Sequence, residues 1–157
     1  MTELSEYIKN RYLINTKLNE EEISLINKNK IPLILEKLWG IVDKVKDQLV
    51  YEFNTDRTTQ SRLFYGFNIE NAWGEIWFGL NMIAWEKYKR PFILQLREDW
   101  ISNSYNEIDI DSELKKIGFE YNEDLEYIYT IKITEDDPIG EIYTIIKECL
   151  IKIGKVL

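Results

Sequence analysis

The sequence contains no histidine, and this absence excludes more chemistry than any other feature of its composition. Ser-His-Asp and Cys-His nucleophilic catalysis, histidine general bases and histidine-containing metal sites are all excluded. Cysteine occurs once, as Cys149, so no internal disulfide is expected and a reducing cytoplasm is the predicted compartment. The opening MTELSEYIKN lacks the apolar core of a signal peptide. No apolar run approaches the roughly 18 residues that a membrane-spanning helix needs, so no membrane association is expected.

The residues that are present predict a folded domain. The chain has 157 residues, of which 45% are hydrophobic and 13% aromatic, a composition that is neither disordered nor fibrous. No linker rich in Pro, Gly or Ser divides it, so residues 1–157 are expected to form a single domain. The sequence has 2 alanines beside abundant Ile, Lys and Asn, a bias that indicates an AT-rich bacterium or its phage.

The first part of the chain, residues 1–53, has the pattern of helices. Asn19 precedes three glutamates, an arrangement typical of a helix N-terminus. Pro32 marks a second helix start. From there the apolar residues recur at spacings of three and four through Leu49, which predicts a helix with one face packed on the core.

The second part, residues 62–157, changes to a period of two. Four strands are predicted at 62–69, 76–82, 92–97 and 125–133. A short helix between the last two strands is expected to be capped by Asp111 or Ser112 and ended by Gly118. A final helix is predicted from Asp137 and Pro138 onward. The resulting fold class is α+β: a largely antiparallel four-stranded sheet with N-terminal helices, a short helix before the last strand and a C-terminal helix.

The acidic residues are concentrated in the C-terminal third. The net charge is -8, and residues 101–157 hold 13 acids against 6 bases. We interpret this region as a negative surface that attracts a basic partner, with a merely solubilising surface as the alternative. The candidate partner-binding acids are Glu107, Asp109, Asp111, Glu123, Asp124, Glu135, Asp136 and Asp137.

Trp77 is the other candidate binding residue. The alternation projects it with Phe64 and Ile93 onto the face opposite the predicted core. That face is too apolar for plain solvent exposure, so either helices cover it, which we favour, or it forms an aromatic protein-binding patch.

Patterns for catalysis and for metal or phosphate binding are incomplete. Asp109, Asp111 and Glu113 are spaced like calcium-loop ligands, but Leu114 replaces the required glycine. Glu113-Leu114-Lys115 matches the Glu-x-Lys element of PD-(D/E)xK nucleases but lies in a predicted helix. No glycine-rich phosphate loop and no basic stripe for nucleic acid occur. No catalytic residue, cofactor, metal site or direct nucleic-acid contact is therefore predicted.

One stretch carries a family resemblance. RLFYGFNIENAWGEIWFGLNMIAWEKYKRPFILQLREDW, followed by LKKIGF, an aromatic strand and an amphipathic helix, resembles the C-terminal region of uncharacterised bacterial proteins in the PD-(D/E)xK nuclease superfamily. The resemblance covers roughly residues 30–157 and implies an accessory domain. The nuclease core has no counterpart here, so no catalytic residue can be transferred.

Together these features predict a non-enzymatic cytoplasmic protein that engages a basic surface of a partner protein. It would act as an inhibitor, immunity or anti-defence protein. If the partner binds nucleic acid, the acidic surface of this chain would mimic the charge of the nucleic acid. The alternative is an accessory or sensor domain of a nuclease-like bacterial defence system. A carboxylate-dependent hydrolase is the third hypothesis, and it requires two acids that converge in a pocket.

Overall fold

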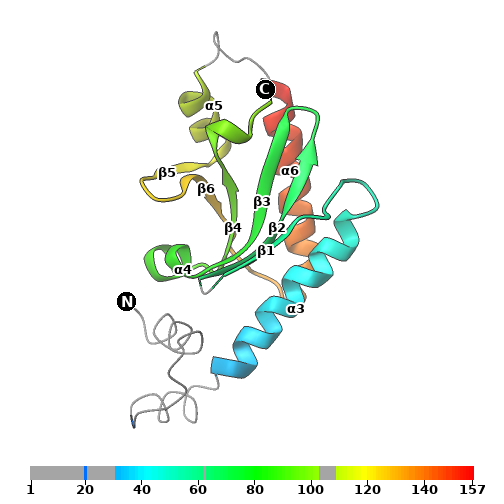
Figure 1. The fold of residues 1–157 in the computed structure, drawn as a ribbon, viewed down its shortest axis with the longest axis vertical. Helices are drawn as coiled ribbons and strands as arrows, with labels where there is room; N and C mark the ends of the chain where they lie inside the picture. Colours follow the sequence, from blue (N-terminus) through cyan, green and yellow to red (C-terminus); the bar gives the residue numbers. More distant parts are fainter. Residues whose placement is uncertain (1–19, 21–30, 62, 103–108) are drawn as a thin grey trace.

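The computed structural model describes residues 20, 31–61, 63–102 and 109–157 (Figure 1). In chain order the elements are α3 (Ile31–Leu49), β1 (Thr58–Gln60), β2 (Phe64–Asn71), β3 (Gly74–Asn81), α4 (Met82–Tyr88), β4 (Phe92–Leu96), the 3₁₀ turn η1 (Glu98–Trp100), α5 (Ile110–Ile117), β5 (Glu120–Asn122), β6 (Glu126–Thr130) and α6 (Pro138–Val156). The helices predicted before residue 31 lie outside the described residues.

The strands form one sheet in the order β1-β2-β3-β4-β6-β5, and every neighbouring pair is antiparallel. The predicted α+β class is confirmed, but the prediction of four strands is wrong, because the sheet formed by the described residues has six. The two additional strands, β1 and β5, are three residues long and lie at the edges. Three residues are too few to show a period of two, which is why the sequence pattern missed them.

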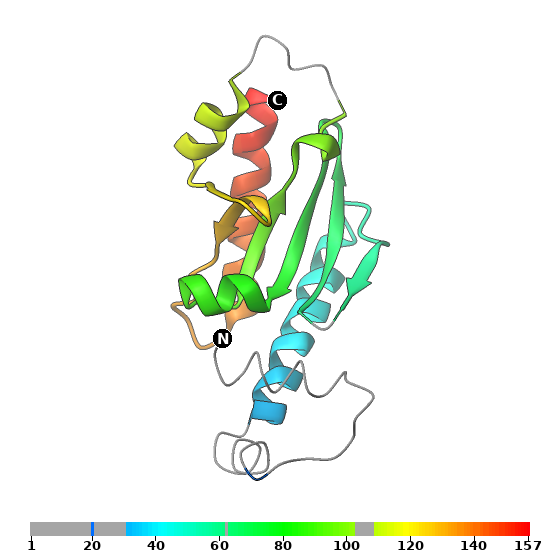
Figure 2. The same cartoon turned by 60° about the vertical axis from the view of Figure 1, so that its left-hand side comes forward.

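One face of the sheet carries the main core. Helices α3 and α6 lie together behind this face (Figure 2), and the outcome agrees with the predicted apolar stripes. Phe67, Phe78 and Phe92 come from three adjacent strands, with ring centroids 5.6 Å and 6.0 Å apart in sequence order. All three side chains are almost completely buried, and the burial of such large side chains is the main source of stability in a domain of this kind.

The capping residues locate the helix starts. Helix α6 begins as predicted, with the Asp137 side chain accepting a hydrogen bond from the Ile139 N–H and Pro138 in the first turn. For α5 the predicted cap is wrong. The cap is Asp109, whose carboxylate accepts from the Ser112 N–H at 3.1 Å, because the apolar Ile110 is buried and already belongs to the helix.

Helix α4 replaces the end of a predicted strand. The alternation predicts a strand through Met82, but Asn81 accepts a hydrogen bond from the Ala84 N–H at 3.0 Å and so caps a helix. Leu125 also differs from its prediction, since it belongs to a cluster on the opposite face of the sheet from Tyr127. It lies before β6, where Glu126 has a positive φ of 64°, so strict alternation does not reach it.

None of the helices in these described stretches is both long and apolar enough to cross a membrane.

Tyrosine–carboxylate hydrogen bonds connect helices to the sheet. From the one between Tyr65 and Asp43 we expect the protein to lose stability at high pH. The Tyr65 hydroxyl on β2 donates to Asp43 on α3. This hydrogen bond to an anion, with partial burial, raises the pKa of Tyr65 to about 12. The folded state therefore holds the proton more tightly than the unfolded chain, whose tyrosines titrate near about 10. The contribution is complete below about pH 10 and is lost as the pH rises toward about 12.

Tyr65→Phe is expected to flatten this decline when the free energy of unfolding is measured by urea titration across the same pH range. The control is Tyr51→Phe, because Tyr51 is 88% exposed and its replacement should leave the slope unchanged. An equally steep decline in Tyr65→Phe would contradict the assignment.

Candidate functional site

The second face of the sheet is covered in part and open in part. A small cluster of buried residues lies on it: Trp77, Ala84, Ile93, Leu125 and Ile128, with Tyr88 and Trp100 packed alongside. These residues come from the sheet, from α4, from η1 and from the turn between β5 and β6. We call this side the open face, because the part of it between these elements contains a cavity.

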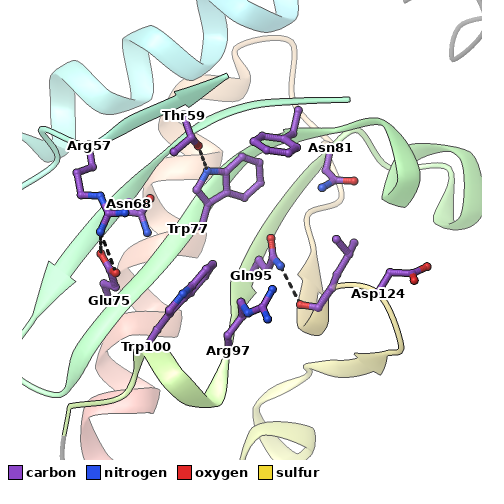
Figure 3. A pocket seen from close by; sticks show the side chains of 12 residues that line it. Arg57, Thr59, Asn68, Glu75, Trp77, Asn81, Gln95, Arg97, Trp100 and Asp124 are labelled. Atoms are coloured by element: carbon purple, nitrogen blue, oxygen red, sulfur yellow. Dashed lines mark hydrogen bonds and ion pairs between the residues drawn. The ribbon is translucent and has the colours of Figure 1, made fainter. Parts of the chain in front are cut away.

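The cavity has a volume of about 300 Å³ (Figure 3). Its lining combines aromatic, carboxamide and charged side chains: Arg57, Thr59, Phe64, Asn68, Glu75, Trp77, Asn81, Gln95, Arg97, Trp100, Asp124 and Leu125. Half of the lining residues belong to β2, β3 and β4. Alternate side chains of a strand point to opposite faces of the sheet, and these residues point away from the main core.

Trp77 forms the floor of the cavity. Gly66 and Gly79 pair directly across β2 and β3, and a Cβ on either would lie within 2.6 Å of the Trp77 ring. The indole therefore occupies space that two side chains would otherwise fill. Its Nε1 donates to Thr59 Oγ1 at 2.7 Å, and Phe64 meets the ring edge-on at 5.8 Å. With 4% exposure, Trp77 is a fixed surface within the site.

Three carboxamides around this floor retain unused hydrogen-bonding groups. Asn68 is 5% exposed, and its side chain has no hydrogen-bond partner among the described residues. Asn81 uses its Oδ1 as the α4 cap, which leaves the NH₂ group. Gln95 donates its Nε2 to the Leu125 carbonyl at 2.9 Å, which leaves its Oε1. None of these carboxamide atoms is among the fully buried atoms that lack a partner in the described residues, so they are open to the cavity and available to a ligand with both donors and acceptors.

The two guanidinium groups in the lining are matched by carboxylates. Arg57 Nη1 lies 3.3 Å from Glu75 Oε1, and Arg97 Nη2 lies 3.2 Å from Glu126 Oε1. Arg97 also lies over the Trp100 ring, 5.9 Å from its centroid. Two basic and two acidic side chains line the cavity, so the lining itself is electrically balanced.

The charged residues that adjoin the lining in the sequence are acidic. Every charged residue outside the lining that directly precedes or follows a lining residue in the chain is acidic: Asp56, Glu98, Asp99, Glu123 and Glu126. Two of these acids, Asp99 and Glu126, pair with Arg97.

The predicted acidic residues do not form one surface. Glu123 and Asp124 lie on the turn before β6, with Asp124 lining the cavity. Glu135, Asp136 and Asp137 follow β6 and precede α6. The five residues of β6 span about 17 Å, so these two groups lie at opposite ends of the strand. Trp77 and the Glu123–Asp124 pair are the predicted site residues that the fold brings to the same place.

Several other predicted acids have structural contacts. Asp109 and Asp137 cap helices. Asp111 pairs with Lys115 at 2.8 Å and accepts from Tyr127, and the Lys115 contact lowers the pKa of Asp111. Glu107 lies outside the described residues. These contacts reduce the acidic charge that remains available to a partner.

The Glu113-Leu114-Lys115 tripeptide lies within α5. Glu113 pairs there with Lys116 at 3.1 Å. Within residues 31–61, 63–102 and 109–157 there is no group of three or more acidic or thiol side chains that could hold a metal ion.

Sequence reasoning missed most of the polar lining. Asn68, Asn81 and Gln95 interrupt otherwise apolar strands at outward positions, and this was the available signal. Arg57 and Trp100 lie outside the predicted strands, so no periodicity could have connected them to the site.

Comparison with known proteins adds no relative, since no protein-family model, no curated protein and no solved structure matches this chain.

Proposed function

We propose that this chain is a non-enzymatic protein-binding module that engages a basic surface of a partner through its open face. The observation that carries the proposal is the cavity, whose lining combines aromatic rings, carboxamides and the carboxylate of Asp124, and whose charged sequence neighbours are acidic. The acidic partner-binding function expected from the charge distribution is thereby assigned to one surface, which includes Glu123, Asp124 and Trp77.

The physical basis combines long-range charge with short-range contact. Flanking carboxylates accelerate the approach of a positively charged partner and disfavour acidic ones. Tryptophan and other aromatic side chains in a partly buried cavity then supply the contact area on which binding energy concentrates. An inhibitor or immunity protein needs this combination of fast capture and tight contact.

The test is neutralisation of the acidic turn. Glu123→Gln with Asp124→Asn removes two negative charges beside the cavity and is expected to weaken capture of basic proteins by about tenfold or more. Binding is measured with immobilised chain and host lysate, followed by titration of each recovered protein. Binding to the unaltered chain should also weaken as NaCl rises from about 0.05 to about 0.5 M.

The matched control is Glu135→Gln with Asp136→Asn. It makes the same change in charge at the other end of β6, and both residues are exposed. Capture by this control should equal that of the unaltered chain. Equal weakening by both double variants would mean that overall charge, rather than the open face, attracts the partner.

The alternative is an accessory or sensor domain of a nuclease-like defence system, and the aromatic lining of the open face favours it, because that role requires docking onto a catalytic subunit. The encoding operon distinguishes the two. A restriction-type neighbourhood supports the accessory role, whereas a toxin or phage neighbourhood supports the inhibitor.

A further inference from the structure

We infer that the cavity on the open face takes one long cationic side chain, Lys or Arg, of the partner together with the peptide groups beside it. This inference rests on the proposed function and specifies its ligand. It concerns the interior of the cavity, whereas the preceding proposal concerns the charge around it.

The carboxamides match peptide groups. A peptide unit offers one N–H donor and one C=O acceptor. The unused groups in the cavity are an NH₂ on Asn81, a carbonyl oxygen on Gln95 and both groups of Asn68. Donors and acceptors are thus present together, and a partner's backbone can satisfy both kinds.

The aromatic lining matches the stem of a long side chain. Lys and Arg carry apolar methylene groups that pack on apolar surfaces while the charged head reaches a polar rim. Trp77 and Trp100 provide such surfaces, and Figure 3 shows both rings in the lining near Gln95 and Arg97. Asp124, which is exposed at the rim, is available to the charged head.

Arg97 already shows this chemistry inside the site. Its guanidinium lies over the Trp100 ring and between two carboxylates, 3.2 Å from Glu126 and 3.5 Å from Asp99. A cation beside an indole and balanced by carboxylates is a favourable arrangement in a partly desolvated place. The same cavity lining offers a partner's cation indole surfaces and the carboxylate of Asp124.

An anionic ligand fits the same cavity poorly. Arg57 pairs with Glu75, and Arg97 pairs through Nη2 with Glu126, so that only its Nε is buried without a hydrogen-bond partner. The charged residues next to the lining in the sequence are acidic. Binding an anion would require breaking these pairs against a repulsive field.

The test uses short Gly/Ser peptides with one central Arg or Lys, compared with a peptide that carries neutral citrulline in place of Arg. Binding to the full chain is followed by NMR through the indole N–H signals of Trp77 and Trp100 and the carboxamide signals of Asn68. The Arg or Lys peptide should give saturable shifts at these groups. The citrulline peptide should bind about tenfold more weakly or worse, because it keeps the shape and loses the charge.

Asn68→Leu is the matched variant. It replaces a carboxamide that faces the cavity by an apolar side chain of similar shape and breaks no side-chain hydrogen bond within the described residues, so the unfolding midpoint should stay the same or rise. Peptide affinity should nevertheless fall several-fold, which a purely structural role of Asn68 would not produce.

Equal affinity for the citrulline peptide, unchanged affinity in Asn68→Leu, or shifts confined to α5 or α6 would each overturn the inference. The proposed function would stand even then, provided that Glu123→Gln with Asp124→Asn still weakens partner capture. Partner capture that does not depend on that acidic turn would instead reject the proposed function and, with it, the inference about the partner's side chain; intact peptide results would then show only that the cavity binds cationic peptides.

Discussion

Phe78→Ala is expected to lower the free energy of unfolding by about 3 to 5 kcal/mol. Phe78 has no exposed surface and lies between the rings of Phe67 and Phe92. Removing the ring loses the burial of a large side chain and leaves a cavity. The cavity cannot collapse fully, because the hydrogen bonds of the sheet fix the spacing of the neighbouring strands. Because small domains have about 5 to 15 kcal/mol in total, the variant should unfold at a much lower urea concentration.

The control is Phe64→Ala, on the opposite face of the same hairpin. Phe64 is 37% exposed and meets Trp77 edge-on, so its loss should cost less than about 1.5 kcal/mol. Both variants are compared by urea denaturation with a common slope. Similar losses in the two would contradict the assignment of the main core to the α3–α6 side.

Gly66→Ala is expected to cost about 1 to 3 kcal/mol and to displace the cavity floor. An added Cβ would lie 2.2 Å from the Phe78 carbonyl oxygen and 2.4 Å from Trp77 Cζ2. Neither neighbour can yield freely, since the carbonyl belongs to the next strand and the Trp77 indole is held by its hydrogen bond to Thr59. The smallest available side chain is therefore too large at this position.

Gly140→Ala provides the comparison with opposite sign. Gly140 lies in α6, and a Cβ added there would meet no described atom within 4 Å apart from the adjacent helix backbone. Alanine favours a helix over glycine by about 0.5 to 1 kcal/mol. Thermal or urea unfolding should show that Gly140→Ala is more stable than the unaltered chain and that Gly66→Ala is less stable. In Gly66→Ala the Trp77 indole N–H signal should also move, and an unmoved signal would show that the floor tolerates the methyl group.

The sequence predicted those parts of the fold in which a single pattern is long enough to repeat. Helices α3 and α6 each carry one apolar stripe, and strands β2, β3 and β4 direct alternate residues to the two faces of the sheet, so their patterns recur with the period of the element. Strands β1 and β5 have three residues, and helix α4 has seven. The two short strands depend on pairing with neighbouring strands, and the short helix depends on its cap residue. Neither of these produces a periodic pattern of apolar residues in the sequence.

The site was predictable to a smaller extent, for a related reason. The outward position of Trp77 follows from alternation within β3, so the sequence identifies it. The charge of Asp124 makes it a candidate, but its place beside Trp77 depends on the pairing of β4 with β6 and on the turn before β6. Arg57 reaches the cavity from before β1, which pairs with β2. Long-range pairing decides which of many acids and bases meet, and local periodicity carries no information about it.

The brevity of the two outer strands also affects how this protein associates with others. A strand at the border of a sheet presents unpaired backbone groups that can add a strand from another chain. Strands β1 and β5 present three residues each at the two borders of the described sheet, too little for a stable ladder. Continuous growth into stacked assemblies is therefore disfavoured, and association is left to side chains on the broad surface, where selectivity for a particular partner can be encoded.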